Sequence, residues 1–417
     1  MEIRRDAYLQ QLIERQHNGL IKVVTGLRRV GKSYLLNTIF YQYLLRSGID
    51  EDHIIRIAFD NPQDEVFTSP KELYTYIRSR ILDSRMYYVI LDEVQLLQNF
   101  ETTLNGLLYQ NNVDVYVTGS NSKFLSTDVI TEFRGRGDEV HVYPLSFAEF
   151  MSVYPKDKYE GLTEYLMYGG LPPVILRDGD RQKEEYLKTL FRETYLKDII
   201  SRNKIRNTPV LETLVDILAS QIGSLTNPRR IIDTFRSVEH VSVSPNTIQA
   251  YLTALEEAYI ISCAKRYNIR GRQYIGSPQK YYFEDNGLRN ARLNFRQYED
   301  SYLLENSIYT ELRRRGFNVD VGSIDTYESN AEKKSVRKHL EVDFVANCGS
   351  KRYYIQSALT LHSPEKVVQE KKSLKTVADS FKKIIVTGDI VKRHTDENGI
   401  VVMSVYDFLL DAASLDA

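Results

Sequence analysis

One short run of residues limits the possible folds of this chain more than any other feature. The run Gly26-Leu-Arg-Arg-Val-Gly31-Lys32-Ser33 matches the pattern G-x-x-x-x-G-K-[ST] at every fixed position. A predicted strand over Leu20–Thr25 precedes it, and an amphipathic helical pattern follows it. Glycines let the backbone curl so that its N–H groups point at phosphate oxygens, and the following helix N-terminus favours the same anion. The run therefore predicts a phosphate-binding loop.

The pattern also predicts a task for individual residues of the loop. Lys32 is expected to place its ammonium group on the β- and γ-phosphates of ATP, and Ser33 to offer its hydroxyl to Mg²⁺. ATP and Mg²⁺ are therefore the expected cofactors. The predicted nucleotide contacts are Gly26, Leu27, Arg28, Arg29, Val30, Gly31, Lys32, Ser33 and Tyr34.

A pair of acidic residues follows another predicted strand. In Tyr87-Tyr-Val-Ile-Leu-Asp92-Glu93, an apolar run typical of a strand buried on both faces ends in two carboxylates. Opposite a phosphate loop, Asp92 is expected to hold Mg²⁺, and Glu93 to orient and deprotonate the attacking water. An Asp-Glu pair after a strand also fits a helix N-cap beside a solvated acid. The phosphate loop favours the catalytic interpretation.

The end of the next predicted strand, Val113–Val117, is a further candidate for the catalytic site. It runs into Thr118-Gly-Ser120-Asn121, and this tip of an ATPase sheet faces the γ-phosphate. Ser120 or Asn121 is therefore expected to hold the water or sense the phosphate. A plain strand-ending turn is the alternative.

Arg134 and Arg136 lie just before a fifth predicted strand, Val140–Tyr143. An arginine at this place can stabilise transition-state charge on the ATP of a neighbouring subunit, so Arg136 is a candidate catalytic residue acting in an oligomer. Solvated arginines in a surface turn are the alternative.

The order of predicted elements indicates the domain organisation. Strands alternate with helices up to Pro144, which predicts a parallel α/β sheet. Helical patterns follow, and then three helices precede short β-like runs at Ile260–Tyr267 and Lys280–Phe283, as in a winged helix-turn-helix. From about Tyr302 the pattern is α/β again, and the polar run Glu328–Lys338 is predicted as a surface loop. The predicted parts are a P-loop ATPase domain at 1–148, a helical lid at 149–208, a winged helix-turn-helix at 209–300 and a C-terminal α/β domain at 301–417.

Composition narrows the choice of partners and compartment. The net charge is −1, so any binding of nucleic acid has to come from a local patch. The two cysteines match neither a disulfide framework nor a zinc pattern, and no stretch approaches the ~20 apolar residues of a membrane span. The N-terminus carries no apolar core of a signal peptide. We therefore expect a cytoplasmic protein with no membrane partner.

Together these motifs resemble those of a family of prokaryotic AAA+-type ATP-binding proteins. The resemblance covers essentially the whole chain, which it implies to be an AAA+-like ATPase with a catalytic glutamate beside the magnesium aspartate and a C-terminal domain of unknown function. The segments that carry it are the phosphate loop, Ile-Leu-Asp92-Glu93-Val-Gln95, Val-Thr118-Gly-Ser120-Asn-Ser, Gly-Arg136, Tyr143-Pro-Leu-Ser-Phe-Ala-Glu149-Phe, Tyr168-Gly-Gly-Leu-Pro172, Lys197-Asp198-Ile199, Lys280-Tyr-Tyr-Phe-Glu-Asp285-Asn-Gly-Leu288, Glu305-Asn306 and Glu341-Val-Asp343-Phe344.

The C-terminal part also resembles PD-(D/E)xK nucleases, which place a helical Glu, a strand Asp and a Glu/Gln-x-Lys around Mg²⁺. Glu305, Asp343 and Gln356 lie at plausible positions, but Ala358 stands where the lysine belongs. Lys366 or Lys371 from the next predicted helix is a possible substitute. Because a cleavage site rarely survives loss of its cation, we expect a vestigial site without nuclease activity.

The predicted winged helix offers candidate contacts to nucleic acid. Ser244-Pro245 opens a helix whose polar face carries Asn246 and Thr247. Basic residues then follow in and around the β-like runs, and four of them are expected to contact phosphates: Arg266, Arg270, Arg272 and Lys280. A protein-interaction module with solvated basic loops is the alternative.

Three functions remain open from the sequence. The first is a Mg²⁺-dependent ATPase whose nucleotide state repositions the winged helix and the nuclease-like domain. The second is a DNA-binding protein in which ATP is a slow switch, and the third is an ATP-dependent nuclease. The candidate partners besides ATP are DNA, further copies of the chain and a partner protein.

Overall fold

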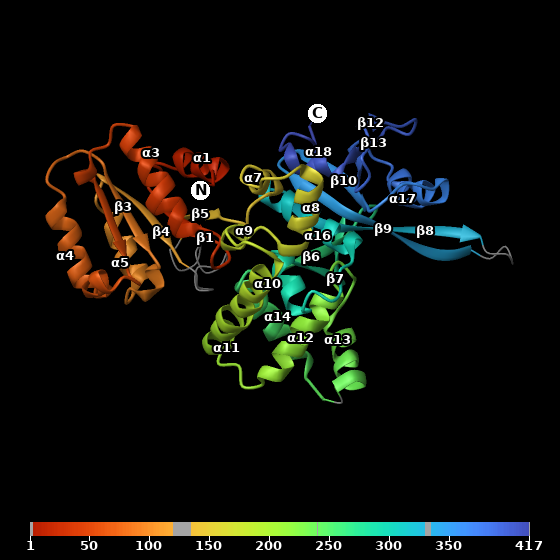
Figure 1. The fold of residues 1–417 in the computed structure, drawn as a ribbon, viewed down its shortest axis with the longest axis horizontal. Helices are drawn as coiled ribbons and strands as arrows, with labels where there is room; N and C mark the ends of the chain where they lie inside the picture. Colours follow the sequence, from red (N-terminus) through yellow and green to blue (C-terminus); the bar gives the residue numbers. More distant parts are fainter. Residues whose placement is uncertain (1–2, 120–134, 240, 330–334, 417) are drawn as a thin grey trace. The chain divides into compact units, whose positions relative to one another are not determined.

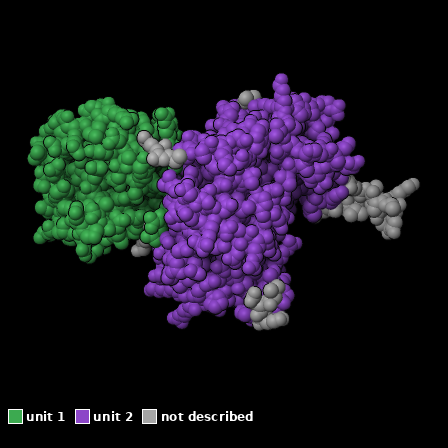
Figure 2. All heavy atoms as spheres, viewed as in Figure 1, with its two compact units in different colours: residues 1–144 green, residues 145–417 purple. Residues whose placement is uncertain are grey.

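In the computed structural model, five parallel strands form one sheet in the N-terminal part of the chain (Figure 1). The structure describes residues 3–119, 135–239, 241–329 and 335–416. They divide into two compact units, unit 1 at Met1–Pro144 and unit 2 at Leu145–Ala417 (Figure 2). The division of unit 2 into lid, winged helix and C-terminal domain stays a prediction.

Unit 1 contains the predicted parallel sheet, with the strand order β2-β3-β4-β1-β5. The strands are β1 Ile21–Thr25, β2 Ile54–Ala58, β3 Tyr87–Asp92, β4 Val113–Thr118 and β5 Gly137–His141. The last one ends earlier than predicted, because the N–H of Tyr143 donates to the Tyr8 hydroxyl at 3.1 Å. β1, which leads into the phosphate loop, lies between β4 and β5.

Helices cover both faces of this sheet, as expected for strands such as β1, β3 and β4 whose residues are all buried. On one face Leu73 and Leu104 pack with Val89 in a common apolar core, and on the other the rings of Phe40 and Tyr116 lie 4.5 Å apart. The helices are α1 Asp6–Glu14, α2 Lys32–Tyr34, α3 Tyr41–Arg46, α4 Pro70–Arg80 and α5 Phe100–Leu107, with a π-helical segment Leu35–Phe40 between α2 and α3 and 3₁₀ turns at Glu51–His53, Pro62–Thr68 and Val94–Leu96.

Unit 2 is built on an eight-stranded mixed sheet with the order β12-β13-β11-β10-β9-β8-β6-β7. The strands are β6 Ile261–Asn268, β7 Gln273–Phe283, β8 Asn318–Ser329, β9 Ser335–Cys348, β10 Lys351–Ala358, β11 Lys382–Thr387, β12 His394–Thr395 and β13 Ile400–Ser404. β6 and β7, expected as a wing, are thus strands of the same sheet as the C-terminal elements, since β6 pairs in parallel with β8. The sheet runs across the boundary predicted at residue 300.

The polar run Glu328–Lys338 corrects another expectation. It was predicted as a surface loop, but β8 and β9 extend into it as an antiparallel pair out to Ser329 and Ser335. The two strands pair through backbone hydrogen bonds, which polar side chains permit as well as apolar ones do. Hydrophobic periodicity therefore gave no sign of this extension of β8 and β9.

Helices surround the sheet of unit 2 in Figure 1. They are α7 Phe147–Met151, α8 Lys158–Tyr168, α9 Pro172–Ile175, α10 Asp180–Thr189, α11 Lys197–Arg202, α12 Thr208–Ser220, α13 Pro228–Thr234, α14 Pro245–Glu257, α15 Asn286–Arg292, α16 Asp300–Arg314, α17 Pro364–Thr376 and α18 Val405–Leu410, with π-helical segments at Leu190–Leu196 and Phe235–Glu239. In the part of the chain that the structure describes, none of the helices has the length and apolar composition needed to cross a bilayer.

Buried polar groups join segments of unit 2 that lie far apart in the sequence. The carboxylate of Asp285, which caps α15, accepts hydrogen bonds from the N–H groups of Gly170 at 2.7 Å and Leu288 at 3.1 Å. The side chain of Asn306 pairs with both the N–H and the carbonyl of Phe283, each at 2.9 Å. The motifs around Gly170, Asp285 and Asn306 therefore stabilise the fold of this unit.

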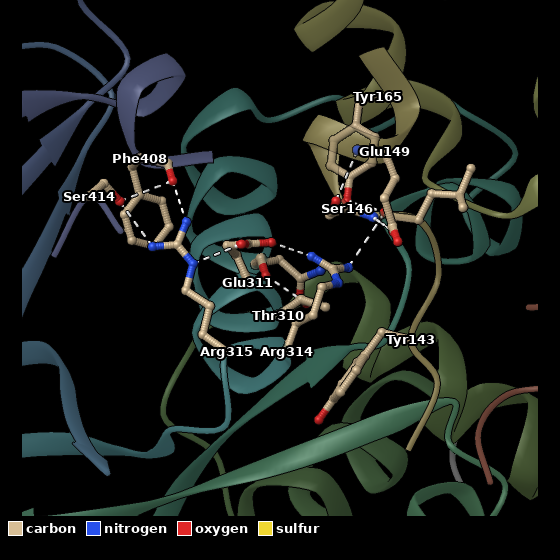
Figure 3. A network of polar contacts seen from close by, with 12 residues as sticks. Tyr143, Ser146, Glu149, Tyr165, Thr310, Glu311, Arg314, Arg315, Phe408 and Ser414 are labelled. Atoms are coloured by element: carbon tan, nitrogen blue, oxygen red, sulfur yellow. Dashed lines mark hydrogen bonds and ion pairs between the residues drawn. The ribbon is translucent and has the colours of Figure 1, made fainter. Parts of the chain in front are cut away.

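A second polar network ties the C-terminal helix α18 to α16 (Figure 3). Arg315 donates to Glu311 at 2.8 Å, to the hydroxyl of Ser414 at 3.0 Å and to the carbonyl of Phe408. Arg314 pairs with the other oxygen of Glu311. Buried Glu311 of α16 thus pairs with two arginines, and Arg315 also binds Phe408 and Ser414.

Candidate functional site

The phosphate loop is held at the carboxyl end of β1 by backbone geometry that only glycine adopts easily. Gly26 has a φ of +128°, and a Cβ atom there would lie 2.2 Å from the carbonyl oxygen of Val142. Gly31 has a φ of +97°, and, its two chain neighbours aside, no atom of the described residues lies within 4 Å of a Cβ built there. Leu27 and Val30 are buried and anchor the loop between the two glycines. The loop therefore curls as the sequence pattern predicts.

Lys32 begins the helix after the loop, and its side chain is buried inside the curl. Its ammonium donates to the carbonyls of Gly26 at 2.9 Å and Leu27 at 3.0 Å. The positive charge consequently lies within the loop whose N–H groups are expected to receive phosphate.

Asp92 lies at the end of β3 and is 5% exposed. Its carboxylate accepts hydrogen bonds from the Ser33 hydroxyl at 3.0 Å, from the Asn37 amide at 3.2 Å and from the Thr118 hydroxyl. Burial raises the pKa of Asp92 above its ordinary value, although the hydrogen bonds from Thr118 and Ser33 oppose that rise. Ser33 and Asp92, which are 59 positions apart, are thus brought together by the fold.

These two groups form a donor set that suits Mg²⁺. Magnesium prefers hard oxygen ligands and usually takes one or two carboxylates beside phosphate oxygens and water. The hydroxyl of Ser33 and the carboxylate of Asp92 are oxygens of that kind, and they lie beside the phosphate loop.

Glu93 follows Asp92 in a left-handed backbone conformation, with a φ of +54°. Its N–H donates to the hydroxyl of Thr118 at 3.0 Å, and its carboxylate accepts a hydrogen bond from the side chain of Gln95. Such a conformation is uncommon for a residue with a side chain and frequent at functional sites. It turns the chain sharply after β3.

Sequence reasoning missed three residues that contact the acidic pair, namely Thr118, Asn37 and Gln95. Asn37 comes four positions after Ser33, so helical spacing places both on one face. Thr118 ends the strand beside β3, and neighbouring parallel strands end at the same edge. Both signals were present in the sequence, although neither is specific.

Of the remaining catalytic candidates of unit 1, the structure describes only Arg136. Ser120, Asn121 and Arg134 lie outside the residues that the structure describes. Arg136 precedes β5, whose first residue Gly137 pairs with Ile21 at the start of β1. Because the strands are parallel, Arg136 lies at the edge of the sheet opposite the phosphate loop of its own chain, where its guanidinium lies 5.7 Å from the ring centre of Tyr109.

Two of the other predicted nucleotide contacts are exposed beside the loop. Tyr34 is 41% exposed on the first helical turn, and Arg29 is exposed with a φ of +70°. Arg28 is partly buried. The contact of each with a nucleotide stays a prediction.

The residues predicted to form a vestigial nuclease site lie partly together in unit 2. Glu305 on α16 and Asp343 on β9 both face the ammonium of Lys280, at 3.0 and 3.9 Å. The side-chain oxygen of Gln356 accepts from the N–H of Asp343 at 3.4 Å. Neither of the two substitute lysines joins them, because Lys366 pairs with Glu370 and Lys371 with Asp396.

Lys280 therefore corrects a prediction about nucleic acid. It is expected to contact phosphates, but its side chain is 5% exposed and paired with carboxylates. An ammonium group so buried and already paired is not available to a phosphate at the surface.

The other predicted nucleic-acid contacts differ in exposure. Arg270 and Arg272 are exposed, and Arg270 donates to the carbonyl of Asp325 at 2.9 Å. Arg266 is partly buried and donates to Ser323 at 2.9 Å. Asn246 is exposed on α14, whereas the hydroxyl of Thr247 lies 2.8 Å from that of Ser244 at the helix cap. Their role in binding stays a prediction.

A phosphate loop after a central parallel strand, facing an Asp-Glu pair on the strand next but one, defines a P-loop nucleotide-binding domain. Residues 18–151 match the family model described as an AAA domain, and residues 159–299 match that of a domain of unknown function, DUF8612. An uncharacterized protein of Haemophilus influenzae is 34% identical over 414 residues, which cover 98% of each chain. The chain belongs to the same family as that protein, and its N-terminal part is an AAA domain.

More distant similarities extend to an archaeon and to solved structures. An uncharacterized protein of Methanocaldococcus jannaschii is 26% identical, covering 86% of this chain and 79% of that protein. The Aeropyrum pernix ORC1 protein, solved in complex with DNA, has a TM-score of 0.30 at 13% identity, covering 70% of this chain and 92% of that one. A polymerase III gamma-subunit-related protein of Thermotoga maritima has a TM-score of 0.28 at 13% identity, covering 60% and 99%.

Proposed function

We propose that this chain binds ATP with Mg²⁺ at its AAA domain and hydrolyses it. The observation that supports the proposal most is the 3.0 Å hydrogen bond between Ser33 and Asp92, the two residues expected to bind magnesium. When bound, Mg²⁺ neutralises charge on the β- and γ-phosphate oxygens. Ser33 and Asp92 would hold it, and Lys32 would add its positive charge to the same oxygens.

Glu93 is the residue that we assign as general base. Glu93 follows Asp92 directly in the turn after β3, and its N–H donates to the Thr118 hydroxyl. A carboxylate so placed can orient a water molecule toward the γ-phosphate and take its proton. Ser120 and Asn121, on the segment after β4, are proposed to help position that water. The exchange of ATP for ADP is then proposed to change the state of unit 2.

Arg136 is proposed to act on the ATP of a neighbouring copy of the chain. Its place at the opposite edge of the sheet supports this, because the guanidinium is far from the phosphate loop of its own subunit. The proposal requires an oligomer for full turnover, so the rate per subunit rises with protein concentration.

The deciding measurement is phosphate release from ATP by the purified chain with Mg²⁺. We expect turnover that Lys32→Ala abolishes by weakening nucleotide binding. Glu93→Gln is expected to lower kcat by about 10²–10⁴-fold with ATP still bound. Lys71→Ala and Glu72→Gln change exposed residues of α4 and serve as matched controls. Absence of turnover at every protein concentration would remove the enzyme assignment, and turnover that survives Glu93→Gln would remove this base.

Duplex DNA in the same assay tests the second candidate function. The exposed Arg270 and Arg272 on the β6–β7 turn favour it, although the burial of Lys280 weakens the proposed basic surface. DNA binding through phosphates would fall steeply with salt, and Arg270→Ala would reduce the salt slope by about one while leaving ATP binding intact. No binding at low salt would favour a protein partner for this unit.

A further inference from the structure

The side chain of Lys280 ends among three carboxylates of unit 2. Its ammonium lies 2.8 Å from Glu341, 3.0 Å from Glu305 and 3.9 Å from Asp343. We call Glu305, Glu341 and Asp343 the carboxylate cluster. Each residue reaches it from a regular element, Lys280 from β7, Glu305 from α16 and the other two from alternate positions of β9. The arrangement is therefore part of the rigid frame of the unit.

The surroundings close the cluster on most sides. The hydroxyl of Tyr282, two positions after Lys280 on β7, donates to Glu305 at 2.7 Å. The N–H of Ser357 donates to Asp343 at 2.8 Å. Gly223 lies so close that a Cβ atom there would be 3.1 Å from the carboxylate of Glu305. Only the Glu341 side chain, which is 35% exposed, opens substantially to solvent.

Such a group of acids needs a cation. Several carboxylates in a small buried volume cannot all be ionised unless positive charge lies among them, because desolvation and mutual repulsion both oppose ionisation. The ammonium of Lys280 lies within ion-pairing distance of all three acids, at 2.8 to 3.9 Å. The lysine is thus charged and supplies that cation.

An ammonium and a divalent metal ion exclude each other here. Magnesium needs oxygen ligands at about 2.0–2.1 Å, in the volume that the ammonium now fills. Among the described residues, no group of three or more His, Cys, Asp or Glu side chains is arranged as metal ligands. Ala358 leaves the expected lysine position without a charge, and Lys280 approaches from a different strand.

We propose that Lys280 is the built-in cation of this cluster, binding Glu305, Glu341 and Asp343 in place of a divalent metal ion, so that unit 2 works without metal and does not cleave nucleic acid. The lysine is consequently a structural part of the sheet and holds β7 to β9 and α16. This inference concerns unit 2 alone and is independent of the ATPase proposal.

The test measures Mn²⁺ binding to the full chain by calorimetry, without nucleotide, in an Asp92→Asn background that removes the expected metal ligand of unit 1. We expect no stoichiometric Mn²⁺ site in this parent. Lys280→Met should lower the midpoint of thermal unfolding and create one Mn²⁺ site that restores the midpoint. Adding Asp343→Asn should remove both the site and the restoration. Lys265→Met, which changes an exposed lysine of β6, is the matched control and should resemble the parent.

Several outcomes would overturn the proposal. A Mn²⁺ site in the parent that Asp343→Asn removes, or Mn²⁺-dependent DNA cleavage by the unmodified chain that Asp343→Asn abolishes, would show a true metal centre. A Lys280→Met chain that unfolds at the parent's temperature, or that folds but gains no Mn²⁺ site, would show that the ammonium does not take the place of the metal. If Lys280→Met fails to fold, the parent measurement still decides.

Discussion

At the scale of single residues, Thr118 contacts both acids of the proposed ATPase site. Its fully buried hydroxyl donates to Asp92 and accepts from the N–H of Glu93 at 3.0 Å. One hydroxyl group therefore fixes a proposed magnesium ligand and the turn that carries the proposed base. We infer that Thr118 is a positioning residue, since its contacts are with Asp92 and Glu93 and it would act through them.

Thr118→Val keeps the shape of the side chain and removes both hydrogen bonds. We expect it to lower kcat by about tenfold to a hundredfold, because small misplacement of a catalytic group is costly, with a smaller change in KM. Thr118→Ser should restore most of the loss, since it returns the hydroxyl. Steady-state ATP hydrolysis checks both variants, and a Thr118→Val enzyme with the parental kcat would contradict the assignment.

At the scale of elements, the phosphate loop depends on the residue just beyond the end of β5 as much as on its own sequence. The carbonyl of Val142 lies against Gly26, while the N–H of Val142 donates to the carbonyl of Thr25 at 2.9 Å. The loop and the end of β5 therefore fit together through backbone atoms alone. Gly31 has no such neighbour in the part of the chain that the structure describes, although its backbone is left-handed as well.

The two glycines should consequently respond differently to alanine. Gly31→Ala adds only backbone strain, about 1–2 kcal/mol, and should retain some ATP binding. Gly26→Ala adds the overlap with the Val142 carbonyl, so we expect a larger loss of stability, by a further 1–3 kcal/mol or so, and loss of ATP binding. Thermal unfolding and titration with a fluorescent ATP analogue measure both effects. Equal behaviour of the two variants would rule out the proposed role of Val142.

At the scale of the whole molecule, buried polar groups hold distant segments of unit 2 together. Asp285 links β7 and α15 to Gly170 after α8, although the two positions are 115 residues apart. Burial raises the pKa of Asp285 to about 6, against the opposing effect of hydrogen bonds from the N–H groups of Gly170, Leu288 and Gly287. The ionised form is thus costly in the folded state.

This cost predicts a pH dependence of stability. Below the ordinary pKa of 3.8 the carboxyl is protonated in both folded and unfolded chains, so it contributes no pH dependence there. As pH rises from there to above about 6, only the unfolded chain ionises freely, and the free energy of unfolding falls by up to about 3 kcal/mol. Urea unfolding followed by circular dichroism between pH 4.5 and 7 measures the slope. Asp285→Asn should reduce the slope of the free energy of unfolding against pH in this window, even if it also changes stability at every pH. An unchanged slope would contradict the prediction.

Sequence patterns by themselves were enough to predict the fold of unit 1, because its loop motif and its apolar strands each consist of contiguous residues. They predicted the parallel sheet of unit 1, which the structure confirms, and the meeting of Ser33 with Asp92 at its edge. The likeness to nucleases pointed to Glu305 and Asp343 as neighbours, but the residue between them was assigned to a DNA surface.

Only the tertiary structure decided the partners of buried charges and the extent of polar strands. From the sequence, Lys280 is one of several basic residues in a predicted wing. In the structure β7 belongs to the eight-stranded sheet, and Lys280 pairs with Glu305 of α16. The segment 328–338 is mostly polar, and the parts of β8 and β9 within it, out to Ser329 and from Ser335, are joined by backbone pairing that requires no hydrophobic period. Local periodicity reports which face of an element is buried, whereas the groups that meet on that face are set by elements far away in the chain.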